Sequence, residues 1–314
     1  MVYTVVLEAT ALRHGGSSPL LGTKLESVMS YKIGIIGRGF VGGAMYENFK
    51  ECFEVASWDT DENKRTLNSF ESFVDWSDII FVCVPTPMKE SGECDTSIVE
   101  NVIRNIANLD RRKYVVIKST VTPGTTERLA QDHNMVIGFN PEFLTEANAY
   151  NDFRTQPLII LGSDDAGLAT VMSQIYYEFN AKVDGRSHVI QRTTKEAELF
   201  KYLANCFLAT KVIFANEFKK LCDAVGVEYG RIAEVATLDK RLGHTHWRVP
   251  GPDGQLGYGG SCFPKDTAAL IQYADNYGST LWLLTEATYI NEEIRHGHIF
   301  EKFKIVSDDV GRDD

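Results

Sequence analysis

The stretch KIGIIGRGFVG, residues 32–42, decides the fold of this 314-residue chain. Its first six residues are typical of a buried strand, and Phe40–Lys50 has the character of a helix. Between them, Gly37, Gly39 and Gly42 have the G-x-G-x-x-G spacing. Gly37 would make the tight turn, and Gly39 would let the backbone approach a pyrophosphate at the helix N-terminus. This order of strand, glycine turn and helix predicts a dinucleotide-binding unit.

An acidic residue follows where such a unit needs one. Asp59 ends the next predicted strand, Phe53–Asp59, 22 residues after Gly37. It would accept hydrogen bonds from the adenosine ribose, and its charge would repel a 2′-phosphate. The sequence therefore favours NAD over NADP. A glycine-rich turn without a ligand is the alternative, which the combination of strand, helix and acid disfavours.

Further short apolar runs follow, separated by helical stretches. They are rich in Val and Ile, which is typical of strands buried on both faces of a parallel sheet. These predicted strands are Asp78–Val84, Tyr114–Lys118, Met135–Phe139 and Leu158–Leu161. We therefore predict an α/β fold, a Rossmann-type doubly wound parallel sheet, over residues 29–190. Residues 1–28 precede it as an N-terminal tail to which the sequence assigns no role.

The pattern becomes helical after Gln191. Residues 195–225 contain neither Pro nor Gly, and apolar residues occur on more than one face of the predicted helix. Such a helix is buried in a core or in a subunit interface. Thr193 or Thr194 can cap it, and Gly226 is a stop signal. We expect an all-helical domain with this long central helix over residues 191–314.

Bulk composition excludes several classes of function. The net charge of −11 and the sequence pI of about 5.2 argue against binding to nucleic acid or to an anionic membrane. No apolar run approaches the ~20 residues of a membrane helix. The six cysteines form no C-x-x-C pair, so we expect no metal site. Scattered cysteines without a secretion-signal pattern favour a cytoplasmic protein with reduced thiols.

Polar motifs follow three of the predicted strands. They are Pro85-Thr86-Pro87, Ser119-Thr120 and the stretch NPEFLTE at 140–146. Ligands of open α/β sheets bind outside the carboxyl ends of the strands, so these motifs should line one crevice with the glycine turn. Glu142 and Glu146 lie four residues apart and would share a face of a helical turn. Ordinary turn chemistry is the alternative for the two threonine motifs.

Two polar residues of the long helix lie in a segment that is otherwise apolar, with Leu199, Phe200, Leu203 and Phe207 around them. Lys201 and Asn205 are four residues apart and so share one face. If buried, they would need polar partners or a ligand. Because most charged side chains are exposed, a solvated stripe is the more ordinary interpretation of this pair taken alone.

The most informative motif is GYGGSCFPKD at residues 257–266. Its glycines allow other atoms to approach the backbone. Lys265 follows Cys262 by three residues, and a cation near a thiol favours the nucleophilic thiolate. Asp266 is placed to act as a base or to orient a water. The alternative, a buried structural cysteine, better suits the cysteines of apolar segments, which are Cys52, Cys83, Cys206 and Cys222.

Together these motifs resemble the UDP-glucose/GDP-mannose dehydrogenase family. The resemblance extends over residues 32–295 and rests on motifs in the family's order, namely GRGFVG (37–42), VPTP (84–87), KSTVTPGTT (118–126), NPEFLTE (140–146), EAELFKYLANCFLA (196–209), LDKRLG (238–243) and GYGGSCFPKD (257–266). The Phe-Pro-Lys-Asp ending is more similar to the UDP-glucose branch than to the N-acetylhexosamine branches.

The resemblance implies a four-electron oxidation, in which UDP-glucose, two NAD+ and water give UDP-glucuronate and two NADH. Cys262 would be the nucleophile and would carry a thiohemiacetal and then a thioester. Lys201 and Asn205 would stabilise the oxyanion. Asp266 and Thr120 would position or activate water. Glu142 would be a base for hydrolysis of the thioester.

The resemblance also implies binding residues. Arg241 would reach the sugar nucleotide of a neighbouring subunit, and the helix 195–225 would form the core of a homodimer. The implied cofactor-binding residues are Gly37, Gly39, Phe40, Val41, Gly42, Asp59, Lys64, Pro85, Thr86, Thr120, Glu146 and Lys265. The implied substrate-binding residues are Glu142, Phe143, Leu144, Lys201, Asn205, Arg241, His246, Tyr258 and Gly259.

The chain also departs from the family pattern. The family usually has a third domain that grips the UDP, whereas this chain stops at residue 314, so we expect a short form without it. The loop between Arg241 and Cys262 is longer than usual, and it either replaces part of the UDP pocket or is an exposed turn. Ala147-Asn148 follows Glu146 where a Gly is common, which would shift that segment.

Three alternatives stay open. The substrate could be GDP-mannose. A two-electron hydroxyacid dehydrogenase would use Lys201 as acid and base and would form one NADH per substrate. A non-catalytic relic would bind NAD without turnover, although the intact motif at 257–266 argues against it.

Overall fold

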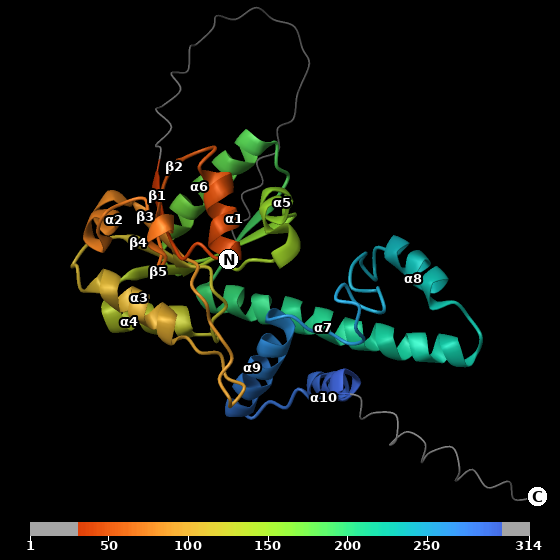
Figure 1. Ribbon diagram of the computed structural model, residues 1–314. Helices are drawn as coiled ribbons and strands as arrows, with labels where there is room; N and C mark the ends of the chain where they lie inside the picture. The colour runs from red at the N-terminus through yellow and green to blue at the C-terminus, as the bar shows by residue number, and fades with distance from the viewer. Residues whose placement is uncertain (1–30, 297–314) are drawn as a thin grey trace, which may run out of the picture. The chain divides into compact units, whose positions relative to one another are not determined.

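The computed structural model describes residues 31–296, in which a seven-stranded sheet precedes four helices (Figure 1). We call residues 31–192 the sheet domain and residues 193–296 the helical domain. The predicted tail at 1–28 and the predicted end of the helical domain, 297–314, lie outside the described residues.

The sheet has the strand order β2-β1-β3-β4-β5-β6-β7. From β1 the chain adds β2 on one side and then returns to add β3 on the other side, so the order of strands reverses between β1 and β3. A ligand site is expected at such a switch point. All neighbouring pairs are parallel except β5 and β6. The strands are β1 (Lys32–Ile36), β2 (Glu54–Trp58), β3 (Ile79–Val82), β4 (Tyr114–Ile117), β5 (Val136–Phe139), β6 (Leu158–Gly162) and β7 (His188–Arg192).

The doubly wound fold is confirmed, with corrections at the edge of the sheet. The sheet is not parallel throughout, because β5 and β6 pair antiparallel and an apolar run carries no information on strand direction. The sequence missed β7, whose residues are at least partly exposed and form no apolar run. Since β7 ends at Arg192, the sheet extends two residues past the boundary expected at 190. Strand β3 stops at Val82, short of the predicted Val84.

Helices cover both faces of the sheet (Figure 1). One face carries α1 (Phe40–Phe49), α5 (Ala149–Thr155) and α6 (Ala166–Val183), and the other carries α2 (Phe70–Trp76), α3 (Ser97–Ala107) and α4 (Thr125–His133). Short 3-10 turns, η1 (Glu62–Lys64) and η2 (Glu146–Asn148), lie in the connections. On the first face the ring of Phe49 is fully buried at the centre of an aromatic cluster that consists of Phe53, Phe81, Phe153, Tyr176 and Phe179.

The long helix α7 (Thr194–Ala224) begins at the sheet and confirms the predicted central helix. Thr193 and Glu196 form a reciprocal capping box at its start, and Gly226, with a φ of +73°, follows its end. The first turns of α7 pack against β5, β6 and α4. There the buried Glu198 accepts hydrogen bonds from the backbone N–H groups of Gly124 at 2.5 Å and Thr126 at 2.9 Å, at the N-terminus of α4. The two domains are thereby hydrogen-bonded to each other.

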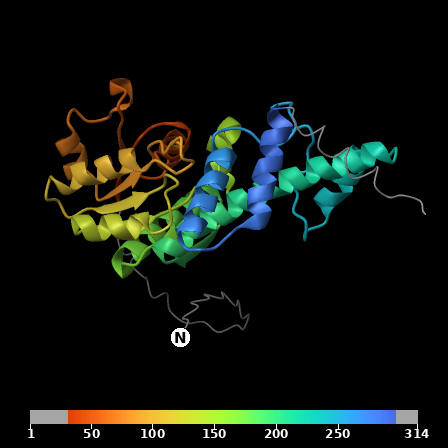
Figure 2. The same ribbon diagram turned by 90° about the horizontal axis from the view of Figure 1, so that it is seen from below.

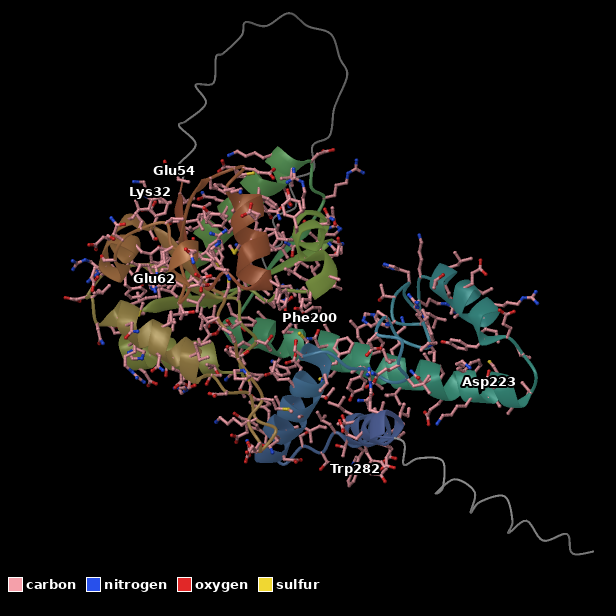
Figure 3. All side chains as sticks on the ribbon, viewed as in Figure 1. Lys32, Glu54, Glu62, Phe200, Asp223 and Trp282 are labelled. Atoms are coloured by element: carbon pink, nitrogen blue, oxygen red, sulfur yellow. The ribbon has the colours of Figure 1, made fainter. Side chains whose placement is uncertain are left out.

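The helical domain continues with α8 (Tyr229–Leu238), α9 (Cys262–Asn276) and α10 (Trp282–His296), all of which contact α7. Figure 2 shows α9 and α10 lying across α7. In Figure 3, Phe200 marks the part of α7 close to the sheet domain and Asp223 the distant end. Within residues 31–296, no helix has the length and apolar character to span a membrane, and no His, Cys, Asp or Glu cluster could hold a metal ion.

Candidate active site

The glycine turn after β1 is so tight that two of its glycines cannot be replaced. Gly37 has a φ of +87°, and a Cβ there would lie 2.7 Å from the Cys83 carbonyl oxygen. A Cβ at Gly42 would lie 1.9 Å from the Gly37 carbonyl oxygen. By contrast, a Cβ at Gly39 would meet no atom within 4 Å. The turn is therefore open at Gly39, where a phosphate can approach the N-terminus of α1.

Asp59 lies directly after β2, beside this turn. Its carboxylate accepts hydrogen bonds from the backbone N–H groups of Arg38 at 2.5 Å and Asp61 at 2.9 Å. Burial acts to raise the pKa of Asp59, but these hydrogen bonds and the charge of Lys64 outweigh it, so the pKa lies below its usual value. Lys64 itself donates to the Arg38 carbonyl at 3.3 Å. An ionised carboxylate thus occupies the place where Rossmann-type domains bind the adenosine ribose.

The predicted polar motifs lie after β3, β4 and β5, at the carboxyl ends of these strands. Thr120 and Glu142 are buried and Thr86 is half-buried, whereas Pro85 and Glu146 are exposed. The prediction that Glu142 and Glu146 share a helical face is wrong, because Glu142 lies in an irregular segment before η2. Pro141 disfavours a helical conformation at the residue before it. Glu142 instead accepts a hydrogen bond from the Leu144 N–H at 2.8 Å.

Lys201 of α7 forms a buried ion pair with Glu142. Its ammonium donates to the Glu142 carboxylate at 3.0 Å and to the Glu142 carbonyl at 2.6 Å. The solvated-stripe interpretation of Lys201 and Asn205 is therefore wrong, since they are only 3% and 7% exposed. Burial acts to raise the pKa of Glu142, but the charge and hydrogen bond of Lys201, the Leu144 N–H and the charge of Lys118 together outweigh it, so the pKa lies below its usual value. Two of the three ammonium N–H bonds are thus used by Glu142.

Asn205 contacts the segment that carries the cysteine. Its amide donates to one oxygen of Asp266 at 2.6 Å, and Lys265 donates to the other at 2.5 Å. Burial acts to lower the pKa of Lys265, but the charge and hydrogen bond of Asp266, together with two nearby thiol groups, outweigh it and raise the pKa. The Cys206 thiol donates to the Asp266 carbonyl at 3.6 Å. Asp266, which is 1% exposed, is therefore fixed between α7 and α9.

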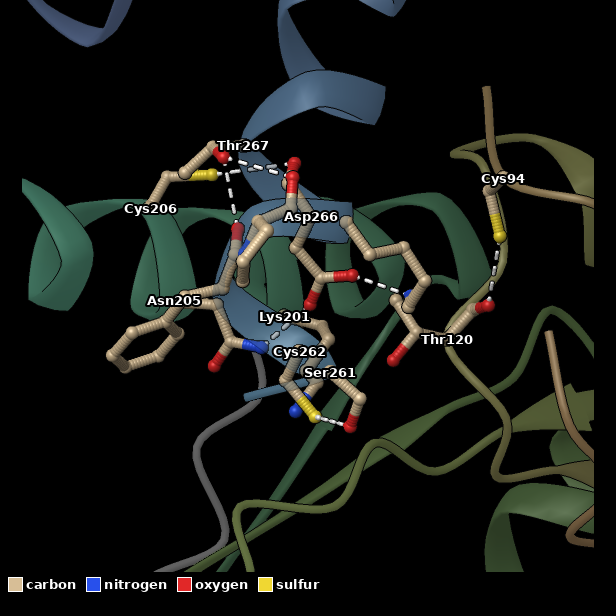
Figure 4. Close-up of polar contacts among 12 residues, drawn as sticks. Cys94, Thr120, Lys201, Asn205, Cys206, Ser261, Cys262, Asp266 and Thr267 are labelled. Carbon is tan, nitrogen blue, oxygen red and sulfur yellow. Dashed lines mark hydrogen bonds and ion pairs between the residues drawn. The ribbon is translucent and has the colours of Figure 1, made fainter. Parts of the chain in front are cut away.

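Cys262 is the first residue of α9 and is half-buried. Its Sγ lies 3.8 Å from Ser261 Oγ, and Figure 4 shows it in the same group as Asn205 and Lys201. The N-terminus of a helix stabilises an anion, which suits a thiolate nucleophile. Lys265, which the sequence predicts beside this thiol, donates a hydrogen bond to Asp266, and Cys262 is among the nearby groups that raise the pKa of Lys265.

The cysteines of apolar segments are mostly in the places that the sequence predicts. Cys83, Cys206 and Cys222 are buried, and burial raises the pKa of Cys83 and of Cys206 to about 12. Cys52 is only half-buried, which corrects the prediction, because it lies just past the end of α1. Such thiols are poor nucleophiles, which sets them apart from the cysteine at the start of α9.

The other predicted substrate-binding residues differ in their surroundings. Arg241 is exposed and pairs with Asp239 at 2.6 Å, outside the group around Cys262. His246 lies against Phe263, with ring centroids 5.6 Å apart, and burial lowers the pKa of His246. Tyr258 is buried in the helical domain. Half-buried residues complete the set, namely Phe143, Leu144 and Gly259.

The sequence analysis missed a buried network behind the ion pair. Lys118, 3% exposed, donates to the side-chain oxygen of Asn140 at 2.7 Å, and the Tyr176 hydroxyl donates to the same oxygen at 2.5 Å. Burial lowers the pKa of Lys118 to about 8. The amide of Asn140 donates to the Ile160 carbonyl at 2.7 Å. The network thus fixes Asn140, two residues before Glu142. The signal for it in the sequence was Lys118, a charged residue at the end of an apolar strand.

Two groups of residues, one in each domain, define the class of protein. The glycine turn and Asp59 fit a dinucleotide, and the helical domain presents a thiol, a buried lysine and a buried carboxylate at the same edge of the sheet. These features are those of an NAD-binding oxidoreductase.

Comparison with known families gives the particular group. Residues 60–180 match the NAD binding domain of the UDP-glucose/GDP-mannose dehydrogenase family, and residues 195–293 match its central domain. The chain belongs to this family, as its sequence motifs predict.

The relatives of this chain include proteins named for each of the two sugar nucleotides in the family name. The chain is 32% identical to UDP-glucose 6-dehydrogenase TuaD of Bacillus subtilis, over 89% of this chain and 66% of that protein. It is 35% identical to GDP-mannose 6-dehydrogenase of Pseudomonas aeruginosa, over 68% of this chain and 49% of that protein. A UDP-glucose dehydrogenase structure from Pyrobaculum islandicum superposes with a TM-score of 0.76 and 28% identity, over 90% of this chain and 73% of that one. The chain thus spans just under two thirds of TuaD.

Removing the cation of the buried ion pair should destabilise the protein. We expect Lys201→Met to cost about 3–5 kcal/mol at pH 7, because Glu142 would stay buried and unpaired. The wild-type pair stabilises above the unfolded carboxyl pKa of about 4.3, and this contribution is lost as the pH falls through the lower folded pKa of Glu142. Without its cation, the buried Glu142 of the variant should take up a proton at a higher pH than the unfolded carboxyl does, because burial raises the pKa of an unpaired carboxyl. The difference between variant and wild type should therefore shrink between pH 7 and pH 4, and shrink further as wild type loses its pair at lower pH, as measured by urea unfolding.

Two further variants control this measurement. The double variant Lys201→Met/Glu142→Gln should be more stable than Lys201→Met at pH 7, since no carboxylate is left without its cation. Lys211 is also buried, although 9% exposed against 3% for Lys201, and donates to the carbonyls of Leu242 and Gly243, so Lys211→Met should lack the pH dependence. A Lys201→Met protein as stable as wild type at pH 7 would contradict the assignment.

Proposed function

We propose that this protein oxidises UDP-glucose to UDP-glucuronate with two NAD+, through a thioester on Cys262. The observation that carries the proposal is the group of side chains around this thiol. In this group Asn205 is hydrogen-bonded to Asp266, and Lys201 forms an ion pair with Glu142. The printed names of several relatives support UDP-glucose as the substrate. The substrate, the reaction steps and the assembly are all parts of this proposal.

The sheet domain supplies the proposed cofactor site. Gly37, Gly39 and Gly42, with Phe40 and Val41 at the start of α1, would hold the pyrophosphate. Asp59 and Lys64 would hold the adenosine ribose. The threonines at the strand ends, with Pro85, Glu146 and Lys265, would surround the nicotinamide. NAD+ held there would supply the hydride acceptor for C6 of the sugar, once at each oxidation level.

Cys262 provides the covalent step. Once C6 is an aldehyde, the thiolate adds to it and forms a thiohemiacetal, whose oxygen carries negative charge. Lys201 keeps one N–H beyond the two that Glu142 uses, and Asn205 presents its amide beside it, so both would stabilise this oxygen. Loss of the second hydride leaves a thioester on Cys262.

Hydrolysis of the thioester needs water and a base. Asp266 and Thr120, both buried, would orient the water. Glu142 would accept its proton, since its low pKa keeps the carboxylate ionised at neutral pH. Attack by the water breaks the C–S bond, releases the carboxylate of UDP-glucuronate and returns the Cys262 thiolate.

The exposed side of α7 supports the proposal that the protein is a homodimer. Leu203, Phe207 and Phe214 are each more than half exposed on this helix. A contiguous apolar face of this kind is typical of a subunit interface. Arg241, which is exposed and does not join the group around Cys262, would then contact the substrate of the partner subunit.

A charge placed on this face should separate the subunits. We expect light scattering to give wild type twice the chain mass of 35.2 kDa. Phe207→Glu should give the mass of one chain, because burying an unpaired carboxylate in an interface is costly. Tyr177→Glu, at an exposed position of α6 in the sheet domain, is the matched control and should stay dimeric. Monomeric wild type would refute the dimer.

The number of NADH formed per sugar tests the proposed reaction. With excess NAD+ we expect two NADH for each UDP-glucose consumed and a UDP-glucuronate product. One NADH per substrate would instead indicate two-electron chemistry of the hydroxyacid dehydrogenase type. Faster turnover of GDP-mannose would assign the other branch of the family. NAD binding without turnover of either sugar nucleotide would indicate a non-catalytic relic.

Replacing the nucleophile separates cofactor binding from chemistry. Cys262→Ser should lower the rate of acid formation by more than about 100-fold and leave the Kd for NAD unchanged, because the glycine turn lies in the other domain. Cys52→Ser is the matched control, a half-buried thiol in the sheet domain, and should keep full activity. Full activity of Cys262→Ser would exclude a covalent mechanism.

A further inference from the structure

Two buried asparagines outside the proposed site hold the backbone just before Cys262. Asn216 of α7 accepts a hydrogen bond from the Gly257 N–H at 3.0 Å. Asn291 of α10 accepts one from the Tyr258 N–H at 2.7 Å and donates to the Tyr258 carbonyl at 3.1 Å. The asparagines are 3% and 2% exposed, so both are desolvated and committed to this contact. The amide of Asn291 thus pairs with Tyr258 as a neighbouring strand would.

The side chain of Tyr258 is fixed by the same helix. Its hydroxyl donates to Thr288 Oγ1 of α10 at 3.4 Å, and its ring packs in a buried cluster with Ala287. Together with the backbone contacts, α10 holds this one residue at its N–H, its carbonyl and its hydroxyl. Tyr258 is therefore an anchor four residues before Cys262.

The neighbouring glycines show how closely the helices approach this segment. Gly257 has a φ of +72°, and a Cβ there would lie 2.5 Å from Asn291 Oδ1. A Cβ at Gly259 would lie 2.7 Å from Arg295 Nη2. Arg295 in turn pairs with Asp253 at 2.8 Å, earlier in the same loop. A side chain at Gly257 would be strained and would meet Asn291, whereas a side chain at Gly259 would require the guanidinium of Arg295 to move. This part of the segment therefore lies directly against α10.

We propose that Asn291 and Asn216 are positioning residues for Cys262, which deepens the proposed function and rests on it. Gly259 and Gly260 between Tyr258 and the start of α9 are intrinsically free in conformation. Fixing the backbone at Gly257 and Tyr258 removes that freedom at the upstream end, and Asp266 removes it at the downstream end. The thiol is then held where it can attack the aldehyde carbon, a step that is sensitive to displacements of about 1 Å.

Hydrogen exchange tests whether the contact fixes the segment. In Asn291→Ala, we expect the amide of Tyr258 to exchange about tenfold faster than in wild type, the factor for loss of one buried hydrogen bond. In Asn216→Ala the faster amide should be that of Gly257. Asn180→Ala is the matched control, since this buried asparagine of α6 donates to the Ser187 carbonyl and lies in the sheet domain. It should leave both amides unchanged.

Kinetics test whether the fixed segment matters for the reaction. We expect kcat for UDP-glucose to fall about 10- to 100-fold in Asn291→Ala. The Kd for NAD and the KM for UDP-glucose should stay close to the wild-type values, which a general loss of structure would not allow. If Asn291→Ala does not fold, Asn291→Ser keeps an acceptor for the Tyr258 N–H and should give a smaller change in the same direction.

The outcomes separate this inference from the proposed function. Unchanged exchange at Tyr258 and Gly257, or faster exchange with an unchanged kcat, would overturn the inference while leaving the function intact. Should the wild-type protein oxidise no sugar nucleotide, the proposed function fails. The rate of Cys262 alkylation by iodoacetamide then decides the inference, with about a tenfold increase expected in Asn291→Ala. An alkylation rate equal to that of wild type would overturn it.

Discussion

The arrangement of the proposed site depends on the buried ion pair between Lys201 and Glu142. Two charges are removed from water there, which costs free energy unless further polar contacts satisfy both groups. The Glu142 carbonyl and the Leu144 N–H provide those contacts. The pair requires the first turns of α7 to stay at the carboxyl edge of the sheet, where Glu198 also holds the N-terminus of α4.

Local chemistry explains what the sequence could predict. The order of strand, glycine turn and acid specifies the start of a doubly wound sheet, because all of these residues belong to one continuous strand–helix–strand unit of the chain. Gly42 is explained by a clash with the Gly37 carbonyl in the same turn and Gly37 by its φ of +87°, whereas the clash of a Gly37 side chain with the Cys83 carbonyl involves a distant segment. The capping box of Thr193 and Glu196 is equally local, so the start of α7 was predicted within one residue.

Contacts between distant segments explain what the sequence could not predict. In the sequence Lys201 resembles a solvated residue. Only the folded structure shows its partner Glu142, which lies 59 positions earlier in the chain. The same is true of Asn291, which meets Tyr258 across 33 positions. The direction of β6 depends on where its neighbours lie, and no feature of the run Leu158–Leu161 records it. Spacing identifies candidate side chains, whereas their burial and pairing belong to the tertiary structure.

The length of α7 has a mechanical consequence. At about 1.5 Å per residue, its 31 residues form an arm about 46 Å long, and Asn205 lies only about 17 Å from the end at the sheet. A tilt of about 5° at the first turn would move the far end by about 4 Å but Asn205 by only about 1.4 Å. Asn205 and its neighbours therefore lie near the end of α7 that stays in place. A displacement of the distant end of the helix moves them only about one third as far.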